Sequence, residues 1–332
     1  MQDQTWNIGR LMATSGSYWQ ACALHAGVKL EIFTWIGSDS IDAQTMAARL
    51  QGDLRGVEML LNALAAMQLL KKDEGRFRNS EIAMTALVKN SPQYMGYMIK
   101  HHHFLVESWA NLDQAVRSGQ PVRKSAVNAD DDRRESFLMG MFNNAMGTAP
   151  QVAKAIDLRG RSKLLDLGGG PGTYAIHFCK NNENLKAVVY DLPTTRPFAE
   201  KIIERFGLSQ RIDFMEGDYL SDILPDFFDA VWLSHVLHGE GPDECRRLIH
   251  KTAAGLPTGG LMVIHDFILD STMDGPVFPA LFALNMLLGT PAGQTYSEEQ
   301  IKEMMAQAGI VQTKRLPFRG PTESGIIAGI KG

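Results

Sequence analysis

A glycine-rich turn near the middle of the chain constrains its fold most. Residues 163–173 read KLLDLGGGPGT, and their apolar start predicts a short buried strand that leads into the turn. Gly168, Gly170 and Gly172 lie at alternate positions, where the lack of a Cβ lets the backbone approach a ligand closely. Asp166 precedes them at the carboxyl end of the strand, where open α/β sheets bind ligands. The segment therefore predicts a ligand site at the edge of a parallel sheet.

A second acidic residue supports this prediction. Residues 186–191 form another strand-like run that ends in Asp191, roughly 20 residues after the glycines. A doubly wound fold places at this point the carboxylate that binds ribose hydroxyls. The dinucleotide pattern G-x-G-x-x-G would require glycine at Thr173, so it fails. The order D-x-G-x-G-x-G is instead similar to the turn of S-adenosylmethionine (SAM) methyltransferases.

Composition limits the remaining possibilities. The 332 residues suggest two domains, and the net charge of −4 gives no electrostatic argument for nucleic acid or an anionic membrane. No apolar run reaches the roughly 18 residues of a membrane span, and no signal peptide is evident. The three cysteines, Cys22, Cys179 and Cys245, follow neither a disulfide nor a zinc pattern, which favours a reducing compartment. We therefore expect a cytoplasmic protein.

Residues 1–150 are predicted to form a mainly helical, winged-helix-like domain. Val57 to Met67 would supply the helix that enters a DNA groove, but the segment is apolar nearly all round and lacks basic residues. Such a helix is expected to be buried, which favours a packing or dimerisation module over DNA binding. The predicted elements are helices at 17–30, 42–50, 55–69 and 91–118, with a hairpin at 69–78.

Residues 151–332 alternate strand and helix, which predicts an α/β domain with a mostly parallel, Rossmann-like sheet of seven strands. The last two strands are separated by prolines and glycine, so we expect them to form an edge hairpin. The predicted strands are 163–167, 186–190, 211–215, 228–233, 260–267, 311–316 and 324–330. The predicted helices are 172–181, 194–206, 242–255, 278–289 and 298–308.

Histidines follow two of these strands on the side of the glycine turn. His235 and His238 come after the fourth strand, and the fifth ends in His265 and Asp266. A histidine can act as general base near neutral pH, and a neighbouring carboxylate fixes its tautomer and stabilises the imidazolium. One of these histidines is therefore predicted to be catalytic. Asp218, just past the third strand, is placed to meet the adenine end of a nucleoside.

A run of three histidines, 101–103, invites a metal hypothesis. Consecutive residues on a helix point in three directions, so they cannot jointly bind one ion. We expect no metal site.

With these residues in view, the chain resembles the plant-type small-molecule O-methyltransferases and their bacterial relatives over nearly its whole length. The motifs that carry the resemblance are LDLGGGPG at 165–172, YDLP at 190–193, EGD at 216–218, HVLH at 235–238 and GGLMVI at 259–264, with LRG at 54–56 and LLNAL at 60–64. The resemblance implies a winged-helix-like dimerisation domain, a Rossmann-like SAM domain and a homodimer. It also implies a role in secondary metabolism, with S-adenosylhomocysteine (SAH) as the product of SAM.

The same resemblance assigns roles to residues. His238 takes the place of the catalytic base, and Asp266 stands where the family has a glutamate. The cofactor contacts would be Asp166, Gly168, Gly170, Gly172, Asp191, Leu192, Gly217, Asp218, Tyr219 and Ser234. The acceptor pocket would include Met139, Phe142, Asn143, Met146, His235, Phe282, Asn285 and Met286.

The chain departs from the family pattern near the base. The usual Asp-Trp that follows it is Gly239-Glu240 here, Thr295 replaces a second acid, and Ser234 replaces a lysine of plant members. The leading hypothesis is SAM-dependent methylation of an aromatic or polyketide-like hydroxyl. The alternatives are C- or N-methylation, a non-methylating tailoring reaction on the same scaffold, and a non-enzymatic winged-helix regulator.

Overall fold

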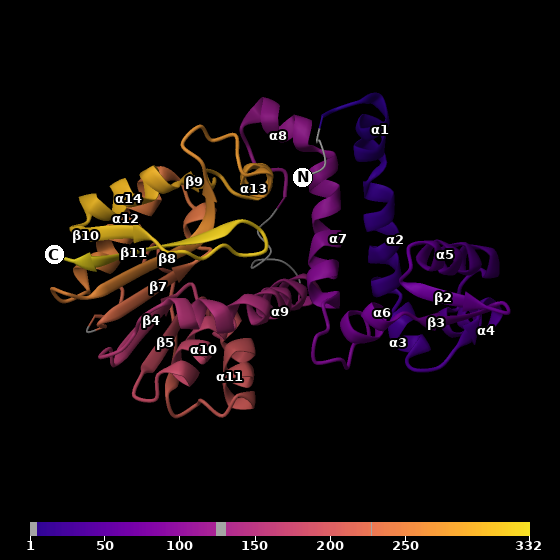
Figure 1. Ribbon diagram of the computed structural model, residues 1–332, viewed down its shortest axis with the longest axis horizontal. Coiled ribbons are helices and arrows are strands. Elements are labelled where there is room, and N and C mark those ends of the chain that lie inside the picture. Colours follow the sequence, from indigo (N-terminus) through magenta and orange to yellow (C-terminus); the bar gives the residue numbers. More distant parts are fainter. Residues whose placement is uncertain (1–4, 124–130, 227) are drawn as a thin grey trace. The chain divides into compact units, whose positions relative to one another are not determined.

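The computed structural model describes residues 5–123, 131–226 and 228–332. The chain divides into two compact units, Met1–Leu105 and Val106–Gly332, which Figure 1 shows in sequence colours. The sequence places the domain boundary at 150 instead. Helix α9 (Asp131–Ala155) accounts for part of the difference, because its Phe142, which precedes residue 150, lies in the hydrophobic core of the second unit. Among the described residues, no helix is both long and apolar enough to cross a membrane.

The first unit combines helices with a small antiparallel sheet in the strand order β1-β3-β2. The helices predicted at 17–30, 42–50 and 55–69 are present as α2, α4 and α5, followed by the predicted hairpin of β2 and β3. Helices α1, α3 and α6 are additional. The elements are α1 (Ile8–Gly16), α2 (Tyr18–Lys29), α3 (Ile32–Ile36), β1 (Ile41–Asp42), α4 (Ala43–Leu50), α5 (Leu54–Ala66), β2 (Leu70–Asp73), β3 (Arg76–Asn79) and α6 (Glu81–Ala86); α7 (Gly96–Ala110) begins here.

Helix α5 differs from its prediction. It buries a single stripe, Val57, Leu61 and Leu64, at the i, i+4, i+7 spacing of one helix face. The opposite side is exposed within this chain, with Met59 55% accessible. The expectation that the helix is buried all round was therefore wrong for the single chain, because only one face meets the core of the unit.

The long helix predicted at 91–118 is two helices. It begins at Gly96 and is interrupted at Asn111, after which α8 (Leu112–Ser118) follows. The amide of Asn111 donates to the carbonyl oxygen of Glu107 at 2.7 Å. A side chain that bonds the backbone in this way competes with regular helix, which explains the break.

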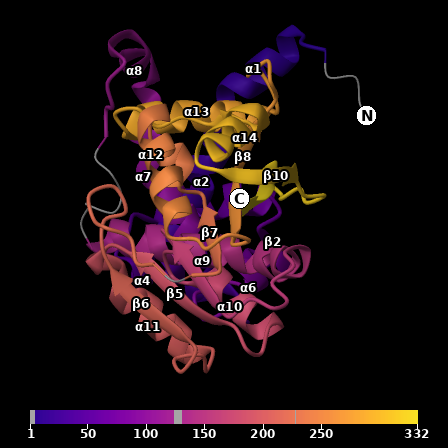
Figure 2. The same cartoon turned by 90° about the vertical axis from the view of Figure 1, so that its left-hand side faces the viewer.

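The second unit is built on the predicted mostly parallel sheet, in the order β10-β11-β8-β7-β4-β5-β6. Figure 2 gives a second view, turned by 90° from Figure 1. In this order, the strands β8, β7, β4, β5 and β6 run parallel to one another. The hairpin β10–β11 adds antiparallel strands at one edge, as predicted, and β9 pairs briefly with β8. The strands are β4 (Lys163–Leu167), β5 (Lys186–Asp191), β6 (Ile212–Glu216), β7 (Ala230–Ser234), β8 (Leu261–Leu269), β9 (Tyr296–Ser297), β10 (Ile310–Arg315) and β11 (Ser324–Lys331). The helices are α10 (Thr173–Asn181), α11 (Arg196–Arg205), α12 (Pro242–Ala254), α13 (Val277–Gly289) and α14 (Glu298–Gln307), with short 3-10 turns at Pro193–Thr195 and Leu237–Gly239.

Alternate residues of the central strands enter two separate hydrophobic cores. Leu164 and Trp232 belong to one core, whereas their neighbours Leu165 and Leu233 belong to the other. Successive side chains of a strand point to opposite faces, so a strand buried on both sides reads as a continuous apolar run. The order reverses at β4, which lies between β5 and β7. The glycine turn after β4 therefore lies at the topological switch point, the usual ligand-binding place of such sheets.

Candidate active site

The glycine turn has a backbone that other residues adopt with difficulty. Gly168, Gly170 and Gly172 have φ angles of +64°, +53° and +75°. A Cβ on Gly168 would lie 2.7 Å from Cγ2 of Val236, whereas one on Gly170 would meet no heavy atom within 4 Å. The turn thus needs glycine for its conformation and, at Gly168, also for close packing.

Asp191 ties this turn to the end of β5. One carboxylate oxygen accepts from the amide of Gly170 at 2.8 Å. The other accepts from the amide of Leu192 at 2.7 Å and from the hydroxyl of Thr195 at 3.0 Å. Burial raises the pKa of Asp191, although these three hydrogen bonds act against the rise. The carboxylate is therefore fixed in place before any ligand arrives.

Asp166 lies beneath the turn and is fully buried. One of its oxygens accepts from the amide of Ala175 at 3.3 Å, and Oδ1 has no partner among the described residues. Burial, with a contribution from the charge of Asp191, raises the pKa of Asp166 to about 7. A Cβ on Gly169 would lie 2.6 Å from the carboxyl carbon of Asp166, so the turn closes directly over this acid.

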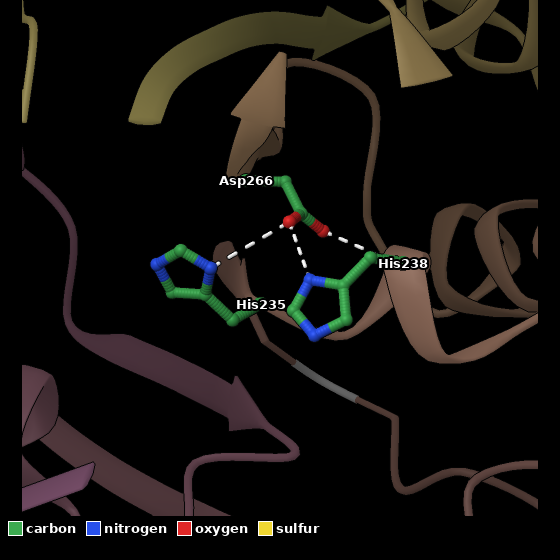
Figure 3. A group of neighbouring side chains, drawn as sticks. All are labelled: His235, His238 and Asp266. Atoms are coloured by element: carbon green, nitrogen blue, oxygen red, sulfur yellow. Dashed lines mark hydrogen bonds and ion pairs between the residues drawn. The ribbon is translucent and has the colours of Figure 1, made fainter. Parts of the chain in front are cut away.

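His238 and Asp266 form a closely paired dyad (Figure 3). The Nδ1 atom of His238 lies 2.6 Å from Oδ1 of Asp266, and the amide of His238 donates to Oδ2 at 3.3 Å. The amide of Phe267 adds a third hydrogen bond at 2.8 Å. Burial alone would raise the pKa of Asp266, but the imidazoles of His238 and His235 beside the carboxylate outweigh burial and lower it. Asp266 is therefore ionised and orients the imidazole.

His235 approaches the same carboxylate from the other side. Its Nδ1 lies 3.5 Å from Oδ1 of Asp266, within ion-pair range, and has no hydrogen-bond partner in the described part of the chain. Its backbone is left-handed, with φ +58°. Such a conformation is uncommon outside glycine, although histidine is among the residues that tolerate it.

His265 has a structural environment instead. It is buried, and its two ring nitrogens lie 2.9 Å from the hydroxyl of Ser234 and 3.0 Å from that of Ser324. Burial and the neighbouring His235 keep the pKa of His265 well below its usual value. Both ring nitrogens have hydrogen-bond partners, so His265 is a neutral part of the core. The hydroxyl of Ser234 is engaged in one of these hydrogen bonds.

The end of β6 and the start of the next loop carry the expected acidic segment. Gly217 donates its amide to the carbonyl of Asp191 at 3.0 Å, and a Cβ there would collide with the Tyr190 hydroxyl. Asp218 accepts from the amide of Leu220 at 2.9 Å.

Tyr219 links this loop to Glu240. It donates its hydroxyl to Oε1 of Glu240 at 2.9 Å. Burial and the adjacent Glu240 raise the pKa of Tyr219 well above its ordinary value, so the phenol keeps its proton.

The residues expected around the acceptor are brought together only in part. Phe282 of α13 packs against His238, with 4.8 Å between ring centroids, and Asn285 and Met286 are buried on the same helix. On α9, Met139 and Met146 are partly buried against the core, and Asn143 lies between them in sequence. Phe142 is buried and packs against Phe206 in the core.

Two residues with a local role escaped sequence reasoning. Thr195 donates to Asp191, and Phe267 packs its ring against His235, His238 and Phe282. A threonine four positions after an acid carries no recognisable signal. The proximity of Phe267 to Asp266 in sequence could have indicated its position at the sheet edge.

Family models match both parts of the chain. An O-methyltransferase domain matches residues 109–311, and an O-methyltransferase dimerisation domain matches residues 12–89. The chain belongs to the O-methyltransferase family. It is therefore a methyltransferase, in a family that depends on SAM.

Relatives cover nearly its whole length. A 3-hydroxy-5-methyl-1-naphthoate 3-O-methyltransferase of Streptomyces sahachiroi is 32% identical, over 94% of this chain and 92% of its own. The N,N-dimethyltransferase OxyT of Streptomyces rimosus is 30% identical over 90% and 89%. The solved structure of PigF with SAH is 26% identical, covers 98% of this chain and 100% of its own, and has a TM-score of 0.89; PigF is a methyl transferase of a Serratia species.

The glycine turn allows a direct test of its backbone. Gly168→Ala should destabilise the protein by about 1–3 kcal/mol, because alanine must adopt a positive φ and its Cβ meets Val236. Urea unfolding of the variant measures the change. Gly147→Ala, on an exposed helical position of α9 with open space around it, is the matched control and should stabilise by about 0.5–1 kcal/mol. Equal stability of Gly168→Ala and wild type would contradict the role of this turn.

Proposed function

We propose that this protein transfers the methyl group of SAM to a hydroxyl of an aromatic or polyketide-like small molecule, with His238 as general base. The observation that carries the proposal is the 2.6 Å contact between His238 Nδ1 and Asp266 Oδ1. It places an oriented imidazole at the carboxyl edge of the sheet, on the same edge as the glycine turn.

The residues at this edge fit a nucleoside with a charged amino-acid tail. The turn after β4 offers a glycine cradle at the N-terminus of α10, where backbone N–H groups favour a carboxylate. The Asp191 carboxylate accepts three hydrogen bonds, and a carboxylate has about four acceptor positions, so one remains for a ribose hydroxyl. Asp166, Leu192, Gly217, Asp218, Tyr219 and Ser234 complete the proposed cofactor contacts. When bound, SAM supplies an electrophilic methyl group on its sulfonium.

The dyad gives His238 the tautomer that a base requires. Its Nδ1–H donates to Asp266, which leaves the lone pair of Nε2 free, and Figure 3 shows Nε2 directed away from the carboxylate. A phenol pKa near 10 against an imidazole pKa near 6.5 makes complete proton transfer uphill by about 4–5 kcal/mol. The ionised Asp266 offsets part of this difference by stabilising the imidazolium.

Aromatic side chains beside the base favour a flat acceptor. The rings of Phe267 and Phe282 lie 5.8 Å and 4.8 Å from that of His238, and they contact each other. Offset and edge-on packing of such rings suits an aromatic substrate. The relative that methylates a naphthoate hydroxyl points in the same direction. Met139, Asn143, Met146, His235, Asn285 and Met286 are proposed to shape the rest of the pocket.

N-methylation is the second candidate. The relative OxyT is an N,N-dimethyltransferase, so similarity at this level does not fix the acceptor atom. An amine with a free lone pair at neutral pH needs no base to become nucleophilic. The two candidates therefore differ in their dependence on His238.

The cofactor site is tested first. Asp191→Ala should abolish binding of SAM and SAH, because the ribose loses its carboxylate and the glycine turn loses its anchor. Isothermal calorimetry on wild type and variant measures the loss. Thr195→Val removes one bond to Asp191 but keeps the carboxylate, so it should retain most of the affinity. Unchanged binding by Asp191→Ala would contradict the assigned site.

The base is tested by His238→Ala. Turnover with a phenolic acceptor should fall by about 10²–10⁴-fold, whereas the SAM affinity should stay nearly unchanged. His250→Asn, on the exposed side of α12, is the control and should leave turnover intact. Full activity in the His238 variant would favour the N-methyl candidate or another reaction on this scaffold.

The cytoplasmic location remains a prediction.

We also propose that the protein forms a homodimer. The first unit carries a dimerisation domain and exposes large apolar side chains on α1 and α2, including Leu11 and Trp19. Sedimentation equilibrium should give twice the chain mass of 36.7 kDa. Trp19→Glu should shift the protein toward monomer, and Ile223→Glu, an exposed apolar position of the second unit, should not. A monomer at micromolar concentration of the wild type would refute the dimer.

A further inference from the structure

Two imidazoles share one carboxylate at the active site, and the proposed reaction needs only one of them. His235, His238 and Asp266 each offer a ligand atom, and these atoms lie within 4.8 Å of one another. The assignment of His238 and Asp266 to catalysis leaves the orientation of His235 unexplained. Figure 3 shows that both Nδ1 atoms are directed at the same oxygen of Asp266.

The geometry points to a divalent metal site of the zinc class, formed by Nδ1 of His235, Nδ1 of His238 and Asp266, whose occupation inhibits the enzyme. Two imidazoles and a carboxylate, with a fourth position open, form a ligand set typical of zinc and similar ions. The earlier expectation of no metal was reasoned from residues 101–103, which belong to the other unit.

One of the three separations already matches this ligand set, and the other two must change as an ion binds, since the ligand atoms lie within 4.8 Å of one another. Ligand atoms about 2.05 Å from a tetrahedral zinc ion are about 3.3 Å apart. His235 and Asp266 already lie at 3.5 Å. Nδ1 of His238 and Oδ1 of Asp266 lie 2.6 Å apart. They must move apart by about 0.7 Å when an ion replaces the proton between them.

The surroundings hold the ligands in place and leave them accessible. The amides of Phe267 and His238 fix the carboxylate of Asp266, as supporting hydrogen bonds do around metal ligands. The side chain of His235 is 29% accessible and that of His238 is 13% accessible, which gives an ion a route from solvent.

His235 has two features that the dyad alone does not account for. Its Nδ1 is buried without a hydrogen-bond partner among the described residues, although a buried polar atom normally has one. Its φ of +58° is a conformation that most side chains avoid. Both features follow if the residue is held so that Nδ1 faces the carboxylate as a metal ligand.

Inhibition follows from the tautomer of His238, and this part of the inference rests on the proposed function. In the free enzyme Nδ1 carries the ring proton and Nε2 is the base. Coordination takes the lone pair of Nδ1, so the neutral ring keeps its single proton on Nε2. The ring then has no lone pair with which to accept the proton of a hydroxyl.

The binding test is independent of turnover. Zn²⁺ should bind the full-length protein with a stoichiometry of one at this site, and Co²⁺ should give the visible absorption bands of a four-coordinate ion. His235→Asn keeps a residue that tolerates a left-handed backbone but removes the imidazole, so it should weaken Zn²⁺ binding by more than about tenfold and abolish the Co²⁺ bands. His250→Asn should change neither. Absence of the Co²⁺ bands in wild type, or their persistence in His235→Asn, would overturn the site.

The activity test separates this inference from the proposed function. Zn²⁺ should reduce methyl transfer by wild type at the concentrations that fill the site, a chelator should restore it, and His235→Asn should need more than about tenfold more Zn²⁺ for the same fractional loss. Wild type that binds Zn²⁺ at this site and keeps its full activity would overturn inhibition and the base assigned to His238, while the metal site would stand.

Discussion

The buried carboxylate of Asp266 is the group on which the active site depends. An ionised acid removed from water requires hydrogen-bond donors, and Asp266 obtains them from two backbone amides and from the imidazole of His238. Because these donors come from β8 and from the turn after β7, the carboxylate also fixes how the two strand ends approach each other. The same requirement holds at Asp191, whose three donors connect β5 to the glycine turn.

Much of the second unit could be predicted from the sequence because its signals are local. Buried parallel strands read as apolar runs, and the alternation of strand and helix leaves few topologies. The carboxyl ends of parallel strands meet at one edge, so residues at or just past the ends of different strands, such as Asp166, Asp191 and His238, could be expected at that edge without any contact being known. The family resemblance then supplied roles that no spacing rule contains.

The remaining features depend on tertiary packing. The contact of Phe142 on α9 with Phe206 is one example, because a helical sequence does not show which neighbour each face will meet. The residue pattern alone does not separate His265 from His238, and only the family resemblance singles out His238. The structural difference lies in two serines beside His265, one of them nearly 60 residues away in β11. The exposed face of α5 was missed for a similar reason, since an all-apolar helix gives no indication of which side the chain itself covers.

The hydrogen bonds that hold the Asp191 carboxylate before any ligand binds have a consequence for product release. Its carboxylate is held by the loop itself, so little ordering remains to oppose ligand binding. In the proposed site this group binds the ribose, which SAM and SAH have in common, and the transferred methyl group plays no part in the contact. Contacts that do not distinguish reactant from product lower the dissociation constants of both. SAH would then occupy the enzyme as readily as SAM, and the rate of methyl transfer in a cell would follow the ratio of SAM to SAH.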